Sequence, residues 1–196
     1  MYFSSSAAYP VSLQDGTSAP VRLREQDLRL DLVHRADQTY GLAKLTGELL
    51  AEHAEQVGTR VVVVRPFSGY GGDQSLDYPF PSFVDRALRR ADPFEVWGDG
   101  EQTRDWIHID DVVAGTLAAV EAEVRGPVNV CTGRGTSFNE LAGLVTSAAG
   151  YAPPIKHLNS MPAGVLHRVG DPTRLHTFYR PRISLEEGVQ RALRWQ

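Results

Sequence analysis

Arg60-Val61-Val62-Val63-Val64-Arg65 is the stretch of this sequence that decides the fold. A continuous run of β-branched residues is typical of a strand that is buried on both faces of a parallel sheet. Gly58 precedes the run, where a helix is expected to end, and that helix extends back to about Tyr40. A glycine-rich turn over 67–72 follows, at the carboxyl edge where open α/β sheets bind their ligands. We therefore expect an α/β fold.

The residues before this helix predict a second strand and a long loop. Two aromatic residues lead into a serine run in Met1-Tyr2-Phe3-Ser4-Ser5-Ser6, as in a short strand that reaches the carboxyl edge of a sheet. Residues 10–37 are charged and contain two prolines, and a loop of this length in a compact fold is usually functional. The expected order is therefore strand, loop, helix, strand.

The remainder of the chain alternates helices with short strands. The expected elements are a helix over 80–90, two extended pieces between 94 and 109 joined by a turn at Asp99-Gly100, a helix from Asp110 or Asp111 to about Glu123, a strand over 128–131, and two helices that begin at the capping boxes Ser137 with Glu140 and Ser184 with Glu187. Residues 151–183 hold five prolines and are expected to form loop with short strands.

Composition limits the classes of function. The chain has 196 residues, 42% of them hydrophobic and 22% charged, which suits one sizeable core. A net charge of −4 argues against a nucleic-acid surface. The single cysteine, Cys131, excludes an internal disulfide, and no signal-peptide pattern or membrane-spanning run is present. We expect no nucleic-acid or membrane partner, and the cytoplasm as the location.

Tyr40 and Lys44 form a candidate proton-transfer pair. Four residues apart on the expected helix, their phenol and ammonium groups share one face at roughly 6 Å. A free phenol has a pKa of about 10 and is a poor base at neutral pH unless a cation stabilises the phenolate, which Lys44 can do. The same spacing is common by chance on solvated helix faces, so the pair predicts catalysis only together with the motifs around it.

Other polar residues have structural interpretations. The six histidines show no spacing typical of metal ligands, and we expect no metal site. His108 is expected to be structural, and Cys131 to be a small buried hydrophobic side chain. Asp110 and Asp111 resemble paired catalytic carboxylates, but their place before an apolar helical run favours helix capping.

Several motifs follow one another in an order typical of a single enzyme family. They are Ser4-Ser5-Ser6-Ala7-Ala8-Tyr9, Tyr40-Gly41-Leu42-Ala43-Lys44, Arg65-Pro66-Phe67-Ser68-Gly69-Tyr70-Gly71 and the long, most specific block from Trp97 to Val112, which contains Gly98-Asp99-Gly100, Arg104-Asp105 and Asp110-Asp111. With these motifs nearly the whole chain resembles the extended short-chain dehydrogenase/reductase family, the epimerases and dehydratases of nucleotide sugars. The resemblance implies a partial Rossmann-like parallel sheet with helices and a small carboxyl-terminal α/β part that binds substrate.

The resemblance also implies a mechanism, in which hydride moves between a sugar carbon and the nicotinamide ring of NAD or NADP. Tyr40 would take the hydroxyl proton, while Lys44 would lower the pKa of the phenol and hold the cofactor ribose. Ser5, or next Ser6, would hydrogen-bond the same sugar oxygen. Pro66 and Phe67 would also lie against the cofactor.

The implied substrate is a nucleoside-diphosphate sugar. Ser68 stands where the family has a substrate-binding Asn. Arg104 and Arg168 are candidates for the diphosphate, because guanidinium groups match phosphate oxygens and stay charged; the alternative for each is a surface ion pair. No Asp-Glu pair follows the serines, which disfavours elimination, and no Cys or Glu stands where some relatives epimerise or decarboxylate. A 4-epimerase or a ketoreductase fits what remains.

One family motif is absent. The glycine-rich dinucleotide fingerprint, Gly-x-x-Gly-x-x-Gly, occurs nowhere in the sequence. We therefore expect a chain truncated at its amino terminus, in which residues 1–72 with the strand near 128–131 form the carboxyl-terminal half of a Rossmann-like domain and residues 73–196 mostly bind substrate. The alternative is an inactive remnant that binds a nucleotide sugar or a partner protein. We expect a homodimer, or a partner that supplies the missing half.

Overall fold

A central parallel sheet organises the computed structural model, which describes residues 1–17, 19–30 and 35–194. Its strand order is β1 (Tyr2–Phe3), β2 (Val62–Pro66) and β7 (Gly126–Val130). All pairs are parallel, with Val64 opposite both Phe3 and Val128. The strand predicted from the valine run is therefore confirmed, although it begins at Val62.

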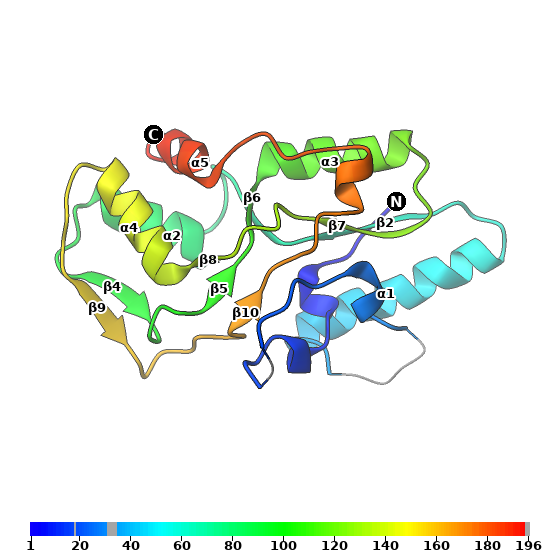
Figure 1. The fold of residues 1–196 in the computed structure, drawn as a ribbon, viewed down its shortest axis with the longest axis horizontal. Helices are drawn as coiled ribbons and strands as arrows, with labels where there is room; N and C mark the ends of the chain where they lie inside the picture. The colour runs from blue at the N-terminus through cyan, green and yellow to red at the C-terminus, as the bar shows by residue number, and fades with distance from the viewer. Residues whose placement is uncertain (18, 31–34, 195–196) are drawn as a thin grey trace.

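The two faces of this sheet are covered by different helices. Val63 packs with Ala51 of α1 (Gln38–Gln56), whereas Val64 packs with Val112 and Ala119 of α3 (Ile109–Glu121). Adjacent residues of a strand point to opposite faces, so a strand between two helices needs apolar residues at every position. This explains why the valines are continuous. Figure 1 shows α1 and α3 on either side of β2 and β7.

A second region of the molecule is built around an aromatic core. It contains three helices, α2 (Pro79–Leu88), α4 (Phe138–Ala148) and α5 (Leu185–Ala192), and the parallel strand pair β4 (Phe94–Trp97) with β9 (Ile155–Leu158). Its buried cluster includes the aromatic residues Phe80, Phe83, Phe94, Trp106 and Phe138. The helices lie together at one end of the molecule, with β4 and β9 below them in Figure 1.

Two small sheets lie between these regions. In one, β3 (Ser68–Tyr70) pairs in parallel with β6 (Trp106–His108). In the other, β5 (Thr103–Arg104) lies between β10 (His167–Arg168) and β8 (Thr136–Ser137). Short 3-10 turns complete the described structure: η1 (Ser6–Ala8), η2 (Val11–Leu13), η3 (Glu25–Asp27) and η4 (Leu175–Thr177). The small sheets place Arg104 and Ser68 near the carboxyl edge of the central sheet.

The start of α3 corrects one of the expectations. The prediction that Asp110 or Asp111 caps α3 is wrong, because the cap is His108, whose Nδ1 accepts the Asp110 N–H at 3.1 Å. Burial lowers the pKa of His108, which keeps the ring neutral and able to accept. Asp111 instead accepts the Tyr179 hydroxyl and the backbone N–H groups of Arg182 and Ile183.

The two predicted capping boxes have different outcomes. In α4, Ser137 and Glu140 each accept the backbone N–H of the other, which confirms the box. In α5, Ser184 accepts the Glu187 N–H, but the Glu187 carboxylate binds the Arg191 guanidinium at 2.6 Å. The second box is therefore only half formed.

Within the described residues, no helix is both long and apolar enough to cross a membrane.

Candidate active site

The serine run lies at the carboxyl end of β1. Ser5 caps the short turn η1, where its Oγ accepts the Ala7 N–H at 3.1 Å, and it keeps partial exposure to solvent. Ser6 is 4% exposed. Of the two candidates, Ser5 has the more accessible hydroxyl.

Tyr40 and Lys44 lie on the first two turns of α1, beside the end of β1. The Tyr40 side chain is 57% exposed. Lys44 Nζ donates to the Phe3 carbonyl at 2.9 Å and lies 5.6 Å from the centroid of the Tyr40 ring. The Phe3 carbonyl of β1 thus holds the ammonium group of Lys44 beside the Tyr40 ring.

Gly41, which the sequence analysis overlooked, lets the helix approach this closely. A Cβ at this position would lie 2.3 Å from the Ala7 carbonyl oxygen, a distance that no side chain tolerates. Any larger residue would push the start of α1 away from η1 and separate Tyr40 from the serines. A glycine directly after the tyrosine, within a helix, was the signal that could have revealed this contact.

A buried polar network fixes α1 to the sheet below the site. Arg65, which is 1% exposed, binds Glu48 through Nε at 2.8 Å and through NH2 at 2.6 Å. Its NH1 donates to the Tyr9 hydroxyl, which donates to Asn129, and Glu48 also accepts from Ser4. Burial alone lowers the pKa of Arg65, but the bonds to Glu48 and the neighbouring charges raise its net pKa above the ordinary value. This guanidinium has a buried carboxylate counter-ion and is therefore structural.

Pro66, Phe67 and Ser68 follow at the carboxyl end of β2. The Phe67 ring is buried against Tyr9 and Cys131, and its N–H donates to Val130 at 3.1 Å. Ser68 is partly exposed, and its N–H donates to the Asp105 carbonyl at 2.9 Å. Cys131 is fully buried, and burial raises the pKa of its thiol, in agreement with the predicted inert role.

Arg104 and Arg168 are neighbours in the small sheet. They occupy paired positions on the parallel strands β5 and β10. Arg168 forms an ion pair with Asp37 at 2.6 Å and donates through Nε to Gln14. Within the described part of the chain, the partly buried Arg104 guanidinium donates to the Thr103 carbonyl at 2.9 Å and lies 5.5 Å from the centroid of the Phe138 ring. Neither partner is an anion.

The electrostatics of Arg104 reflect this lack of a counter-ion. Burial and then the positive charge of Arg168 lower the pKa of Arg104 to about 10, and the negative charge of Asp37 compensates only in part. A partly buried cation beside a second cation favours the binding of an anion. The two side chains therefore form a candidate anion site.

Asp105 connects the strand ends around this site. The sequence did not indicate this structural role. Its fully buried carboxylate accepts the N–H and hydroxyl of Thr132 and the N–H groups of Gly133 and Gly170. Burial raises its pKa, and these bonds lower it only in part. The donors come from the ends of β7 and β10, so Asp105 joins the anion site to the central sheet.

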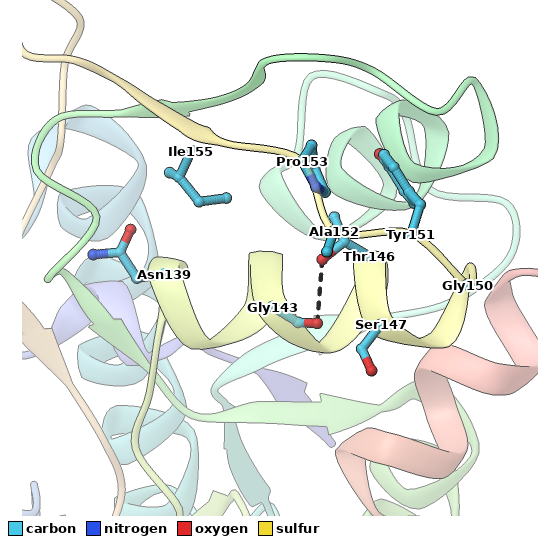
Figure 2. Close-up of a pocket in the computed structure, with 9 residues that line it drawn as sticks. All are labelled: Asn139, Gly143, Thr146, Ser147, Gly150, Tyr151, Ala152, Pro153 and Ile155. Atoms are coloured by element: carbon cyan, nitrogen blue, oxygen red, sulfur yellow. Dashed lines mark hydrogen bonds between the residues drawn. The ribbon is translucent and has the colours of Figure 1, made fainter.

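Two surface grooves lie away from these residues. One of them, drawn in Figure 2, runs between α4 and the residues before β9 and has a volume of about 570 Å³. Small residues such as Gly143, Gly150 and Ala152 line much of it, and Thr146 in its floor donates to the Gly143 carbonyl of its own helix. This groove lacks charged groups, so it is not the candidate active site.

The described residues bring no three His, Cys, Asp or Glu side chains together as metal ligands. His34, one of the six histidines considered in the sequence, lies outside the described residues. The described structure has a hydroxyl, a phenol and an ammonium group near the carboxyl end of β1. Asp37, at the start of α1, binds the Arg168 guanidinium, and Arg104 is the paired neighbour of Arg168 in the small sheet. This is a donor set for sugar and phosphate oxygens.

A parallel sheet between two layers of helices, with polar groups at its carboxyl edge, defines a Rossmann-like α/β protein. The profile of the NAD dependent epimerase/dehydratase family matches residues 1–131, and the chain belongs to this family. The fold class and the family expected from the sequence are thereby confirmed.

Known proteins of several activities are similar to this chain. A dTDP-4-dehydro-6-deoxy-D-allose reductase from Streptomyces sp is 34% identical over 91% of this chain and 56% of that protein. A mutant UDP-glucuronic acid 4-epimerase from Bacillus cereus, solved with a fluorinated UDP-glucuronic acid and NAD, has a TM-score of 0.81 and 25% identity over 98% of this chain and 59% of that one. UDP-glucose 4-epimerase from Thermotoga maritima, solved with UDP-glucose, has a TM-score of 0.78, with 28% identity over 98% of this chain and 61% of that one. The chain spans about half the length of the curated relatives it matches.

Proposed function

We propose that this chain carries the proton-transfer groups and the diphosphate site of an NAD(P)-dependent enzyme that oxidises or reduces one carbon of a nucleoside-diphosphate sugar, as a 4-epimerase or a ketoreductase does. The observation that carries the proposal is the Arg104 guanidinium, which stands beside Arg168 without an acidic partner among the described residues. A diphosphate supplies the missing negative charge in the bidentate geometry that arginine favours.

In this proposal each residue of the site has one task. Tyr40 accepts the proton of the sugar hydroxyl during oxidation and returns it during reduction. Lys44, held by the Phe3 carbonyl, stabilises the phenolate. Ser5, with Ser6 as the alternative, donates to the reacting oxygen, and Ser68 contacts the sugar. Arg104 and Arg168 orient the diphosphate so that the reacting carbon faces Tyr40.

The residues at the carboxyl ends of β1 and β2 also fit the nicotinamide end of NAD or NADP. Tyr40 is solvent-accessible, and Lys44 lies next to it within reach of a ribose hydroxyl. When bound, this cofactor supplies the acceptor and donor of hydride. Pro66 and the Phe67 backbone would border it. The relative from Bacillus cereus was solved with NAD, which supports the proposal.

The division of the chain follows from these tasks. We propose that residues 1–72, with the strand near 128–131, hold the proton-transfer groups and that residues 73–196 mostly hold the substrate. We also propose that two copies associate through α1, whose Leu42, Leu49 and Leu50 are exposed on the surface.

Ligand binding and turnover test the function together. We expect a nucleoside-diphosphate sugar to raise the melting temperature of the chain, and NAD to raise it further in the presence of the sugar. Tyr40→Phe is expected to reduce turnover at least about 1,000-fold while leaving sugar-nucleotide affinity unchanged, because only the proton acceptor is removed. A response to the sugar but not to NAD would instead favour a binding remnant, and full turnover by the Phe variant would refute the assignment of Tyr40.

A further inference from the structure

Two features are unusual at the start of α1: the side chain in the N-cap position makes no capping bond, and the first helical residue has a strained backbone conformation. Asp37 is in the N-cap position, and its carbonyl accepts the Gly41 N–H at 2.9 Å. Aspartate is among the best N-cap side chains, yet the Asp37 carboxylate makes no capping bond. The next residue, Gln38, has a φ of +56°, a left-handed conformation that is uncommon for a residue with a side chain.

The Asp37 carboxylate binds Arg168 instead. Its Oδ2 lies 2.6 Å from Arg168 NH2, and the two side chains are only 26% and 12% exposed. Arg168 is held on its other side by Gln14, whose Oε1 accepts from Nε at 2.5 Å. A charge-assisted bond with this little solvent competes well with a bond to a neutral helix N–H. The Asp37 carboxylate therefore pairs with an arginine of the anion site and does not cap the helix.

Asp37 also compensates part of the positive charge of the anion site. Its negative charge acts on Arg104 as well as on Arg168. A diphosphate carries more negative charge than one carboxylate and presents several oxygens to the two guanidinium groups. Binding of such a ligand therefore competes with Asp37 for Arg168 and repels the freed carboxylate.

We propose that Asp37 is a positioning residue that couples occupancy of the anion site to the helix turn that carries Tyr40. A bound diphosphate takes Arg168, and the released Asp37 carboxylate caps the N–H of Thr39 or Tyr40, the second and third residues of α1. Gln38 then adopts a helical φ, and the first turn becomes rigid with Tyr40 on it. The inference rests on the proposed function only for the identity of the anion.

The ligand-free chain tests the coupling without any nucleotide. Arg168→Gln frees Asp37, and we expect amide hydrogen exchange at Thr39, Tyr40 and Gly41 to slow by about fivefold, the effect of one N-cap. The double variant Asp37→Ala with Arg168→Gln should lose this protection. Arg191→Gln, which removes an arginine from exposed pairs with Glu187 and Asp110, is the matched control and should leave these amides unchanged. Unchanged exchange in folded Arg168→Gln overturns the coupling.

Titration with uridine diphosphate gives a second test that does not depend on the folding of that variant. In the wild-type chain, the ligand should slow exchange at the same three amides. Asp37→Ala should bind uridine diphosphate about tenfold more tightly, because the internal competitor is gone, and should show no added protection of these amides. Equal or weaker binding by Asp37→Ala overturns the proposal. If the wild-type chain binds no nucleotide at all, the proposed function fails, and the ligand-free comparison still decides the coupling.

Discussion

Arg65, which is fully buried, and Arg104, which is partly buried, lie in different regions and have different partners. Arg65, in the central sheet, has a bidentate carboxylate partner in Glu48 and further bonds to Tyr9 and Glu25. Arg104, in the small sheet, has a backbone carbonyl and an aromatic face. A buried cation with its own counter-ion is part of the scaffold, whereas one without it is prepared for a ligand. The presence of an acidic counter-ion is the main difference between the two arginines.

Removing the acidic partner of Arg65 should have the largest effect and tests whether this arginine is part of the scaffold. Glu48→Gln leaves the guanidinium buried without a negative charge and should lower the free energy of unfolding by about 3–5 kcal/mol. Urea denaturation followed by circular dichroism measures this loss. The matched control is Glu52→Gln, an exposed residue one helical turn further on, which should change stability by less than about 0.5 kcal/mol. Similar losses in both variants would show that the Glu48 pair carries no special weight.

Replacing Arg104, which has no acidic partner among the described residues, should reduce ligand affinity and leave stability intact. Arg104→Gln should weaken the binding of uridine diphosphate by about 10- to 100-fold, since a charge-assisted contact to phosphate is lost. Stability should stay the same or rise, because the variant no longer buries a charge beside Arg168. Calorimetric titration and denaturation of the same protein give both values. A destabilised variant with normal affinity would place Arg104 in the scaffold with Arg65.

A smaller effect is expected from alkaline pH. The pKa of Arg104 is lowered to about 10 by burial and by Arg168, whereas the net pKa of Arg65 is raised above its ordinary value. Nucleotide affinity should therefore fall about twofold between pH 8 and pH 10, as half of the Arg104 side chains lose their proton. The free energy of unfolding should change in the opposite direction from the affinity. Between pH 10 and the ordinary pKa of 12.5, Arg104 binds more protons in the unfolded chain than in the folded chain. Its contribution to the free energy of unfolding therefore rises with pH over this range.

Carbon NMR of the guanidinium groups separates the two arginines in this experiment. The Arg104 Cζ resonance should titrate near pH 10, and that of Arg65 should remain constant over the same range. In Arg104→Gln, the loss of nucleotide affinity between pH 8 and pH 10 should disappear. A pH-dependent loss of the same size in that variant would assign it to another group.

Local patterns predicted much of the fold. The valine run predicted β2 because a strand between two helix layers needs apolar residues on both faces. The predicted helix from Tyr40 to about Glu55 agrees with α1 within the usual uncertainty at helix ends. The start of α3 was misjudged because His108 acts as the cap there, while Asp111 turns inward to the chain near Arg182. Aspartate is the commoner cap, so the local rule chose the wrong residue.

The candidate site was only partly predictable, because local patterns do not show which distant residues meet. Tyr40 and Lys44 lie on one helix, so their mutual geometry follows from the helical repeat. Glu48 extends that spacing by one further turn, and its partner in β2 is visible only in the fold. The bond between Arg168 and Asp37 joins residues 131 positions apart, and nothing local in the sequence around either one indicates it.

The sequence by itself determined the order of strands and helices, the phenol and ammonium pair, and the chemical types available at the sheet edge, because these depend on periodicity and near neighbours. Only the tertiary structure decided which charges are compensated. Pairing depends on which side chains share a low-dielectric space, and residues far apart in the chain meet there. Arg65 is thus paired with Glu48, Arg104 has no acidic partner among the described residues, and Asp37 binds Arg168 from the start of α1.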